Sequence, residues 1–475
     1  MYCLVLTGSY LHAGGGGRRT YEVLKHLSEF DITPILYIPF SDLSFSMLLA
    51  EIYKLEKIDA VLKKLESFNV IIPEEIYNVI DAISSNLQHS LDSFQKKTPQ
   101  KFLLSFVKHF ETIKANILLA KRFLERYIQD EKAIQNKLVF VYSMNEIPSC
   151  VITGTFLAAA LKKKLYILLQ LEPFKPLKDF VVEDWRLKVT LAKRPISREL
   201  LRLLLLISRF MLTNTRYAYS YAYRNNVLDG LLAVSEAPLI ISKLNSWAYR
   251  RRIGVKIVKP GNSVDEAVSK YANEQERQHL LNKKEDIAIY YGRLHSPKGL
   301  FEVIPIAKML ASKGYHLVMA GRFDNIVEKE LFFKKCKEKG IKNIEYLGWL
   351  PREELLNIVS KSKLLIYPSH SDAFPLVVLE ALFLGCSVVA YDIPAIRSVY
   401  KGLRPVKIVK EYDCKAMANE AIKILKRDIS RHEEEHLDRN LIKFLQLHSS
   451  WKNVAEADIN AIREIMNTTR NRYKR

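Results

Sequence analysis

Cysteine is scarce in this chain, with five residues among 475 and no C-x-x-C pair. That scarcity excludes a disulfide framework, gives no zinc-binding spacing, and is typical of proteins from a reducing compartment. Long apolar runs are missing too, because no stretch approaches the roughly 20 residues of a membrane-spanning helix. The N-terminus, MYCLVLTGS, lacks the basic start and the length of a signal peptide. We therefore expect a cytoplasmic protein without a membrane-spanning helix.

Acidic residues are outnumbered, with 52 Asp and Glu against 73 Lys and Arg, and the basic excess is uneven. Residues 191–260 contain 13 basic and three acidic side chains, which gives this stretch a net charge of +10. Such a patch attracts polyanions, namely nucleic acid, anionic lipid or phosphate-bearing substrates.

Apolar runs of strand length alternate with helical patterns along two parts of the chain. This alternation is typical of parallel, doubly wound sheets. We predict an α/β protein with two Rossmann-like domains that face one another across a cleft. The strand-like runs are residues 3–8, 32–39, 138–143, 165–170 and 230–235 in the first half, and 287–292, 316–321, 343–348, 363–369 and 387–392 in the second.

The domain boundaries follow from the same pattern. We predict a first Rossmann-like domain over residues 1–255, on the acceptor side of the cleft, and a second over 256–440 that binds a nucleotide-linked ligand. Within the first domain, residues 41–135 repeat Leu, Ile and Phe at three- and four-residue spacing, which indicates an inserted bundle of helices. Residues 441–475 are predicted to form a helix that returns to the first domain.

A glycine run, Gly14–Gly17, follows the first predicted strand and precedes a helix predicted from about Arg18 to Phe30. Backbone N–H groups at such a helix start can approach a phosphate, and the missing side chains of Gly15 and Gly16 leave room for it. The run is not G-x-G-x-x-G, so a merely flexible turn is the alternative.

Two cations, Arg293 and Lys298, follow the first strand of the second domain in the stretch GRLHSPKGL. Doubly wound folds bind ligands at the carboxyl ends of their strands. A diphosphate is well matched by a planar guanidinium together with a compact ammonium. Two solvated surface cations are the alternative interpretation.

Two carboxylates, Asp372 and Glu380, interrupt the apolar stretch SDAFPLVVLEALFLGCSVVAYD. Asp372 is predicted to lie in a loop after a buried strand, and Glu380 within the helix that follows. The free N–H groups of the helix start, near Phe374, Leu376 and Val377, would point at the same edge. Carboxylates accept hydrogen bonds from vicinal hydroxyls, so this arrangement suits a sugar and a ribose with phosphates between them.

At this point the second half resembles the retaining glycosyltransferases with the GT-B fold, in family four of that class (glycosyl transferases group 1). The first half resembles them less specifically, through its first strand, the glycine run and AVSEAP. The segment 41–135 has no counterpart in the resemblance. The motifs that carry it are VKPGNSVD (258–265), GRLHSPKG (292–299), LVMAGRFD (317–324), YLGWLPREELL (346–356) and PSHSDAFPLVVLEALFLGCSVVA (368–390).

The resemblance implies a role for each of these residues. Glu380 matches the second glutamate of the E-x7-E motif, which would hold the ribose hydroxyls, and Asp372 matches the first, which contacts the donor sugar. Aspartate is one methylene shorter than the usual glutamate. Gly348 falls in the loop that lines the nucleobase pocket. Arg293 and Lys298 match the pair that neutralises the diphosphate. Where relatives have a histidine near the sugar, this chain has LLQLEPF (168–174).

The implied activity is transfer of a sugar from a nucleotide-sugar donor to an acceptor with retained anomeric configuration. Arg293, Lys298 and the helix-start amides would stabilise the charge that grows on the leaving diphosphate. No D-x-D motif occurs, and we expect neither a metal nor a cofactor. Two alternatives remain: a sugar-nucleotide hydrolase or epimerase, and a catalytically impaired homologue that binds donor as a partner subunit, which the shorter Asp372 favours.

The basic region suggests the nature of the acceptor. Arg198, Arg202 and Arg209 fall on one stripe of an otherwise apolar segment, RELLRLLLLISRFML, and the aromatic run RYAYSYAYR follows. One interpretation is a helix packed on the core of the first domain. The other is contact of residues 194–224 with an anionic membrane surface, which would make the protein peripheral and suit a lipid-linked glycan acceptor. No nucleic-acid-binding motif is present, so nucleic acid is not expected as a partner.

Overall fold

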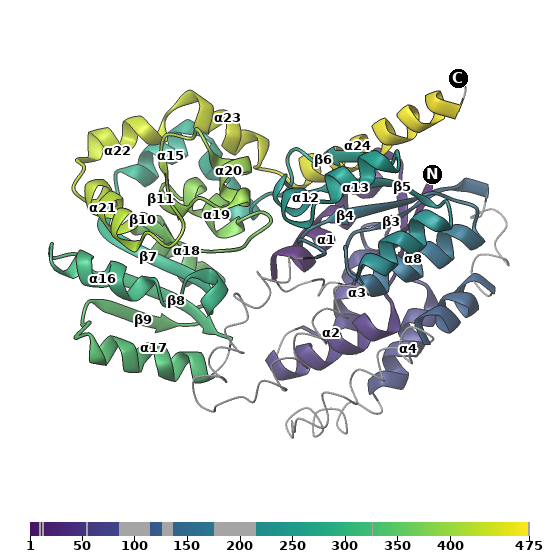
Figure 1. Cartoon of the computed structure of the whole chain (residues 1–475), viewed down its shortest axis with the longest axis horizontal. Coiled ribbons are helices and arrows are strands. Elements are labelled where there is room, and N and C mark those ends of the chain that lie inside the picture. Colours follow the sequence, from purple (N-terminus) through teal and green to yellow (C-terminus); the bar gives the residue numbers. More distant parts are fainter. Residues whose placement is uncertain are drawn as a thin grey trace.

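The computed structural model describes residues 1–8, 11, 14–53, 56–84, 115–125, 136–174, 215–324 and 326–473. Within them the chain forms two β-sheets of six strands each, and every strand pairing is parallel. Helices flank both sheets, and the two halves lie side by side (Figure 1). This confirms the predicted fold class of two doubly wound domains.

The first sheet has the strand order β2-β1-β3-β4-β5-β6. Its central strands are almost entirely buried, which explains their continuous apolar runs. The strands are β1 Tyr2–Leu6, β2 Thr33–Tyr37, β3 Leu138–Ser143, β4 Leu165–Leu169, β5 Leu228–Ala233 and β6 Gly254–Ile257. The accompanying helices are α1 Gly14–His26, η1 Leu27–Phe30, α8 Pro148–Ala160, α12 Ala237–Ser242 and α13 Leu244–Arg250, together with residues 215–224.

The second sheet has the order β12-β11-β10-β7-β8-β9. Its strands are β7 Glu285–Leu294, β8 Leu317–Phe323, β9 Ile344–Gly348, β10 Ser362–Tyr367, β11 Ser387–Tyr391 and β12 Val406–Val409. Its helices are α14 Glu266–Ser269, η3 Lys270–Ala272, α15 Glu274–Leu281, η4 Ser296–Lys298, α16 Val303–Ala311, α17 Ile326–Glu338, α18 Arg352–Lys361, α19 Leu376–Phe383, α20 Pro394–Tyr400, α21 Cys414–Leu425, α22 Ile429–His436 and α23 Arg439–Leu447.

The described part of the insertion, predicted over 41–135, is helical. It contains α2 Phe40–Tyr53, α3 Ile58–Glu66, α4 Glu74–Ser84 and a further helix at residues 115–123. Its remaining stretches, 54–55, 85–114 and 126–135, lie outside the described residues. An apolar hollow of about 320 Å³ opens between α4, residues 115–123 and the end of β2.

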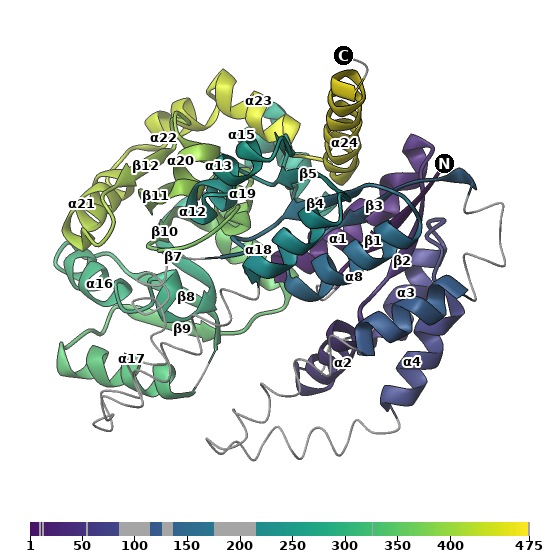
Figure 2. The same cartoon turned by 45° about the vertical axis from the view of Figure 1, so that its right-hand side comes forward.

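The last helix, α24 Trp451–Tyr473, packs on the first domain although it follows the second in sequence (Figures 1 and 2). Its Asp458 accepts two hydrogen bonds from Arg19 of α1, at 2.6 and 3.0 Å, and one from Tyr142 of β3 at 2.8 Å. Arg19 also donates to the carbonyl of Gly261, at 2.8 Å, in the connection between the domains. The carboxylate of Asp458 and the guanidinium of Arg19 are fully buried, so they tie the two ends of the chain to this connection.

Some details differ from the prediction. The glycine run does not precede the first helix, because α1 begins at Gly14 and contains all four glycines in its first turns. The first sheet continues through β6 to Ile257, two residues beyond the predicted boundary at 255. The strands β6 and β12 were not predicted, since each has only four residues and is half-buried at a sheet edge.

Two further sequence-based expectations concern compartment and membrane. All five cysteines are free thiols. No helix among the described residues has both the length and the apolar character that crossing a bilayer requires.

Candidate functional site

Lys298 and Asp372 meet at the carboxyl edge of the second sheet. They follow β7 and β10, which are neighbours in that sheet, so the segments after the two strands lie together. The Nζ atom of Lys298 lies 2.6 Å from Oδ2 of Asp372 and 2.8 Å from the carbonyl oxygen of Ser371. An ammonium has three protons, so one donor of Lys298 remains beyond these two contacts.

Asp372 is fixed on both of its oxygens. Tyr367 donates to Oδ2 at 2.6 Å, and the backbone N–H of Ala373 donates to Oδ1 at 2.9 Å. Burial alone would raise the pKa of this carboxyl, but the charge and hydrogen bond of Lys298 hold the pKa below its usual 3.8. Asp372 is therefore an ionised acceptor with a fixed orientation.

Glu380 lies on α19 and binds Arg352, the first residue of α18. The Nη1 and Nη2 atoms of Arg352 donate to the two oxygens of Glu380, at 3.2 and 2.5 Å. Arg352 also donates to Asp265 at 2.7 and 2.9 Å, and Asp265 forms an ion pair with Arg18 of α1. A ladder of alternating charges thus runs from the first domain to the carboxylate predicted to hold a ribose.

A buried arginine and a partly buried lysine hold the end of α19. Arg277 donates to the carbonyls of Leu382 and Phe383, at 3.0 and 3.1 Å, and Lys284 donates to that of Leu384 at 2.5 Å. Cations are favoured at helix C-termini, where the last carbonyls lack partners. Burial lowers the pKa of Lys284 to about 8. These contacts fix the helix that carries Glu380.

Arg293 lies near the end of β7 and is exposed. Its register partner on β8 is Arg322, so two guanidinium-bearing residues stand side by side at this edge. Within the described part of the chain, no carboxylate lies within ion-pair distance of Arg293. No carboxylate of the described residues therefore neutralises its positive charge, which is available to a bound anion.

The helix start predicted near Phe374, Leu376 and Val377 is present, but Phe374 lies before it. Helix α19 begins at Leu376, after Pro375, so its first N–H groups have no acceptor within the helix. Leu376 and Val377 are partly exposed there. The side chain of Phe374 is instead buried, and packs against Tyr400 and His448 with ring centroids 6.0 and 5.6 Å apart.

The predicted glycines lie in two places, the first turn of α1 and the end of β9. A Cβ added at Gly15 would lie 3.0 Å from Leu376 of α19, so the glycine run and that helix face one another across the domains. Gly16 follows within the same first turn of α1. Gly348 ends β9 with φ of 73° and open space on its Cβ side, and the next residue, Trp349, is 66% exposed.

Sequence reasoning missed three charged contributors, namely Arg18, Asp265 and Arg352, and left Glu172 without a role. Glu172 follows β4 of the first domain, and its Oε1 accepts a hydrogen bond from Ser371 at 3.1 Å. Ser235 donates across the same gap to the carbonyl of Ala373. The signal was available, because Asp265 and Arg352 lie in stretches that also carry the family resemblance.

His370, two residues before Asp372, lies between two carboxylates. Its ring nitrogens are 3.1 Å from Glu302 and 2.8 Å from Glu411, and its ring stacks on Tyr412. Burial alone would lower the pKa of His370, but Glu302 and Glu411 raise it above its usual 6.5.

Because that pKa is raised on folding, the imidazolium contributes stability that is complete below about pH 6.5 and is lost as the pH rises through the folded-state pKa. We expect the urea midpoint of the wild type to fall on going from acidic to alkaline pH more steeply than that of His370→Gln. Parallel pH profiles of the two proteins would contradict this.

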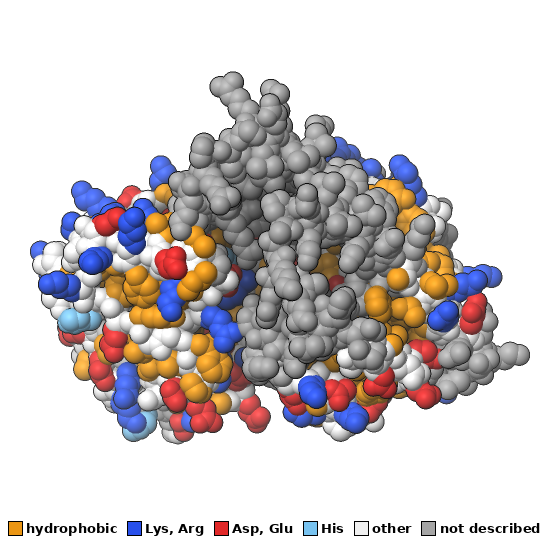
Figure 3. Space-filling model, turned by 90° about the horizontal axis from the view of Figure 1, so that it is seen from below, with side chains coloured by type: hydrophobic (Ala, Val, Ile, Leu, Met, Phe, Trp, Pro, Cys, Tyr) orange, Lys and Arg blue, Asp and Glu red, His pale blue; other side chains and the backbone are white. Residues whose placement is uncertain are grey.

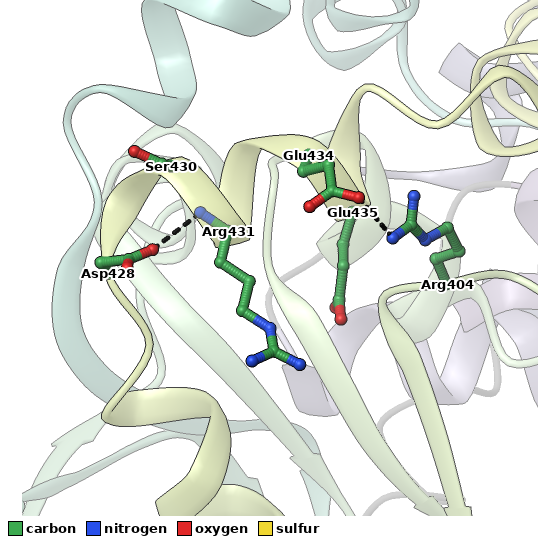
Figure 4. A pocket seen from close by; sticks show the side chains of 6 residues that line it. All are labelled: Arg404, Asp428, Ser430, Arg431, Glu434 and Glu435. Atoms are coloured by element: carbon green, nitrogen blue, oxygen red, sulfur yellow. Dashed lines mark hydrogen bonds and ion pairs between the residues drawn. The ribbon is translucent and has the colours of Figure 1, made fainter.

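No group of three or more His, Cys, Asp or Glu side chains in the described residues is arranged to hold a metal ion. A surface hollow of about 570 Å³ lies elsewhere on the second domain (Figure 4). Arg404 donates there to Glu434, and Asp428 accepts from the backbone N–H of Arg431, so both carboxylates already have partners within the chain. None of the predicted site residues lines it.

The comparisons with known proteins concern the same domain. Residues 272–441 match the family model described as glycosyl transferases group 1. These residues form a group 1 glycosyltransferase domain. The match includes the predicted residues Arg293, Lys298, Asp372 and Glu380.

Curated relatives of the chain are bacterial glycosyltransferases. The chain is 27% identical over 179 residues to O-antigen chain mannosyltransferase B of Escherichia coli, covering 37% of this chain and 45% of that protein. It is 28% identical over 139 residues to N,N'-diacetylbacillosaminyl-diphospho-undecaprenol alpha-1,3-N-acetylgalactosaminyltransferase of Campylobacter jejuni, covering 27% and 35%. The matched stretch thus spans less than half the length of each relative.

Solved structures extend the likeness in fold to nearly the whole chain. Anabaena HepE, in complex with UDP and glucose, superposes with a TM-score of 0.59 at 12% identity, covering 98% of this chain and all of that one. Sucrose-phosphate synthase from Thermosynechococcus elongatus gives a TM-score of 0.61 at 14% identity, covering 98% and 100%. At these identities the superpositions establish the GT-B fold alone.

Proposed function

We propose that this protein is a retaining glycosyltransferase that moves a sugar from a nucleotide-sugar donor to an acceptor. The observation that carries the proposal is the contact of Lys298 with Asp372 at the carboxyl edge of the second sheet, just before helix α19, which carries Glu380 and faces the glycine run of the first domain. Two acids that accept hydroxyls and two cations, Lys298 and Arg293, match the groups of a nucleotide sugar.

The reaction proposed leaves each group a definite task. The bond between C1 of the sugar and the diphosphate oxygen breaks, and its electron pair stays on the diphosphate. The acceptor hydroxyl oxygen bonds to C1 on the same face, and its proton passes to the departing phosphate oxygen. Lys298, Arg293 and the first amides of α19 stabilise the charge that grows on the diphosphate. With these cations supplied by the chain, we propose that no metal takes part.

The likeness to the Campylobacter enzyme, whose name includes a diphospho-undecaprenol acceptor, supports a lipid-linked glycan as the acceptor. A peripheral, cytoplasmic location is proposed with it, and the free cysteines support a reducing compartment. Of residues 194–224, proposed from the sequence to touch a membrane, 194–214 lie outside the described residues.

The test is transfer of radiolabel from a panel of UDP- and GDP-sugars to a membrane lipid extract. Labelled product in the lipid phase supports the proposal. Release of free sugar alone would show a hydrolase, an altered sugar still attached to the nucleotide would show an epimerase, and donor binding without turnover would show the impaired homologue.

The contact of Glu380 with Arg352 leads to a prediction about ribose binding. A carboxylate has lone pairs beyond the two that Arg352 uses, and hydrogen bonds to charged groups contribute about 1.5–3 kcal/mol. Glu380→Ala should weaken nucleoside diphosphate binding by roughly 10- to 100-fold, as measured by titration calorimetry. The loss should vanish for the 2′,3′-dideoxy nucleotide. Equal losses for both nucleotides, or a similar loss in the exposed control Glu353→Ala, would contradict a ribose contact.

A further inference from the structure

The aromatic run at 216–224 folds into a surface together with α13. Tyr219 and Tyr223, on the helix of residues 215–224, pack edge-on against Trp247 of α13, with centroids 6.4 and 6.2 Å apart. Arg251 lies between the rings, 5.4 Å from the centroid of Tyr223 and 4.6 Å from that of Trp247. These contacts make the two helices one continuous face, here called the tyrosine–arginine face, which comprises residues 215–224 and 244–252.

Large side chains are exposed on this face. Tyr249 is 85% exposed, Tyr217 54% and Tyr223 39%. Exposed apolar and aromatic groups gathered in one place mark interaction sites more often than single ones do. Tyrosine in particular combines an apolar ring with a polar tip, which suits a boundary between water and an apolar phase.

The charge around these rings has one sign. The tyrosine–arginine face contains five arginines and no acidic residue, a net charge of +5. By contrast, Lys and Arg mix with Asp and Glu on the left-hand part of Figure 3, which is the second domain. The tyrosine–arginine face is therefore complementary to an anionic surface.

We propose that the tyrosine–arginine face binds bilayers that contain anionic lipids. Basic side chains near such a surface contribute about 1 kcal/mol each, and the tyrosine rings add interfacial contacts. Nucleic acid fits less well, because base stacking needs free ring faces. Tyr217 and Tyr221 stack on each other at 6.0 Å, and Tyr223 carries Arg251.

The face is continuous with the site described above. Phe174 packs edge-on against Tyr219 at 5.6 Å and under the guanidinium of Arg216 at the same distance. Glu172, two residues before Phe174, accepts a hydrogen bond from Ser371 beside Asp372. A protein bound through this face holds the site around Asp372 close to the lipid. The delivery of a lipid-linked acceptor to the donor rests on the proposed function. The binding of this face to lipid does not depend on it.

Vesicle flotation tests the binding without any donor or acceptor. Phosphatidylcholine vesicles with and without phosphatidylglycerol are mixed with the full chain at low and high salt. We expect flotation only with phosphatidylglycerol, weakened by salt. Arg224→Glu with Arg250→Glu should lower the apparent affinity by roughly 30-fold or more. The control, Lys337→Glu with Lys339→Glu on the exposed surface of the second domain, has the same change in net charge and should float like the wild type.

Other results overturn the proposal. Absence of flotation with anionic vesicles removes it, and so does an equal loss in the lysine control, which would show a response to net charge alone. Wild-type flotation of the arginine variant would place the binding elsewhere in the chain. Displacement from vesicles by a homopolymer RNA, abolished by Tyr217→Ala with Tyr249→Ala, would assign the face to nucleic acid. None of these results depends on whether sugar transfer occurs.

Discussion

Lys298→Ala is expected to lower the kcat of sugar transfer by roughly 10²–10³-fold, the usual loss when one donor to a developing oxyanion is removed. The remaining proton of its ammonium is the one available to the diphosphate, since the other contacts go to Asp372 and Ser371. The substitution also leaves the partly buried Asp372 carboxylate without its cation, so the sugar contact should weaken along with the diphosphate contact.

Two further variants separate these effects. Lys298→Arg keeps the charge and should recover part of kcat, while Lys308→Ala, at an exposed lysine on α16, should change kcat by less than about twofold, as expected for a surface substitution. Initial rates over a range of donor concentration give kcat and KM separately. A Lys298→Ala enzyme with the kcat of the wild type would show that the ammonium is not needed in the transition state.

Asp458→Ala is expected to lower the free energy of unfolding by about 3–5 kcal/mol, because removal of one partner leaves a buried charge uncompensated. Arg19 has no exposed surface and loses both hydrogen bonds to the carboxylate. Since Arg19 also holds the carbonyl of Gly261, the connection between the domains should loosen with it.

Glu464→Ala on the same helix is the matched control. Its ion pair with Lys256 is solvent-exposed, with side chains 60% and 43% exposed, and exposed pairs contribute about 0–1 kcal/mol. Urea unfolding followed by tryptophan fluorescence measures both variants. Equal, small losses would show that the Arg19–Asp458 pair does not hold α24 on the first domain.

Most of the fold could be predicted from the sequence for one physical reason. Strands of a parallel sheet covered on both faces are apolar throughout, so runs such as LVFVYS and KLLIYPS stand out from the helices between them. The edge strands β6 and β12 are short and half-buried, and they carry no such run. The glycine run was predicted to precede the helix because glycine is a poor helix former. In the structure, α1 includes all four glycines.

The site could be predicted only where its residues follow strands in the family-like motifs. Lys298 and Asp372 meet because β7 and β10 are neighbours, which the doubly wound pattern allows one to expect. The contact of Arg352 with Glu380 and Asp265 joins residues 28 and 87 positions apart. No local spacing encodes such a contact, because it depends on how α18, α19 and the domain connection pack.

The central claim is that a nucleoside diphosphate binds in the crevice between the domains, with its charge on Lys298 and Arg293 and its ribose on Glu380. A crystal structure of the protein grown with UDP or GDP tests it most directly. The account predicts diphosphate oxygens within hydrogen-bond distance of Lys298 and ribose hydroxyls at Glu380. A nucleotide bound on any other surface, or those side chains left without contact to it, would contradict the account.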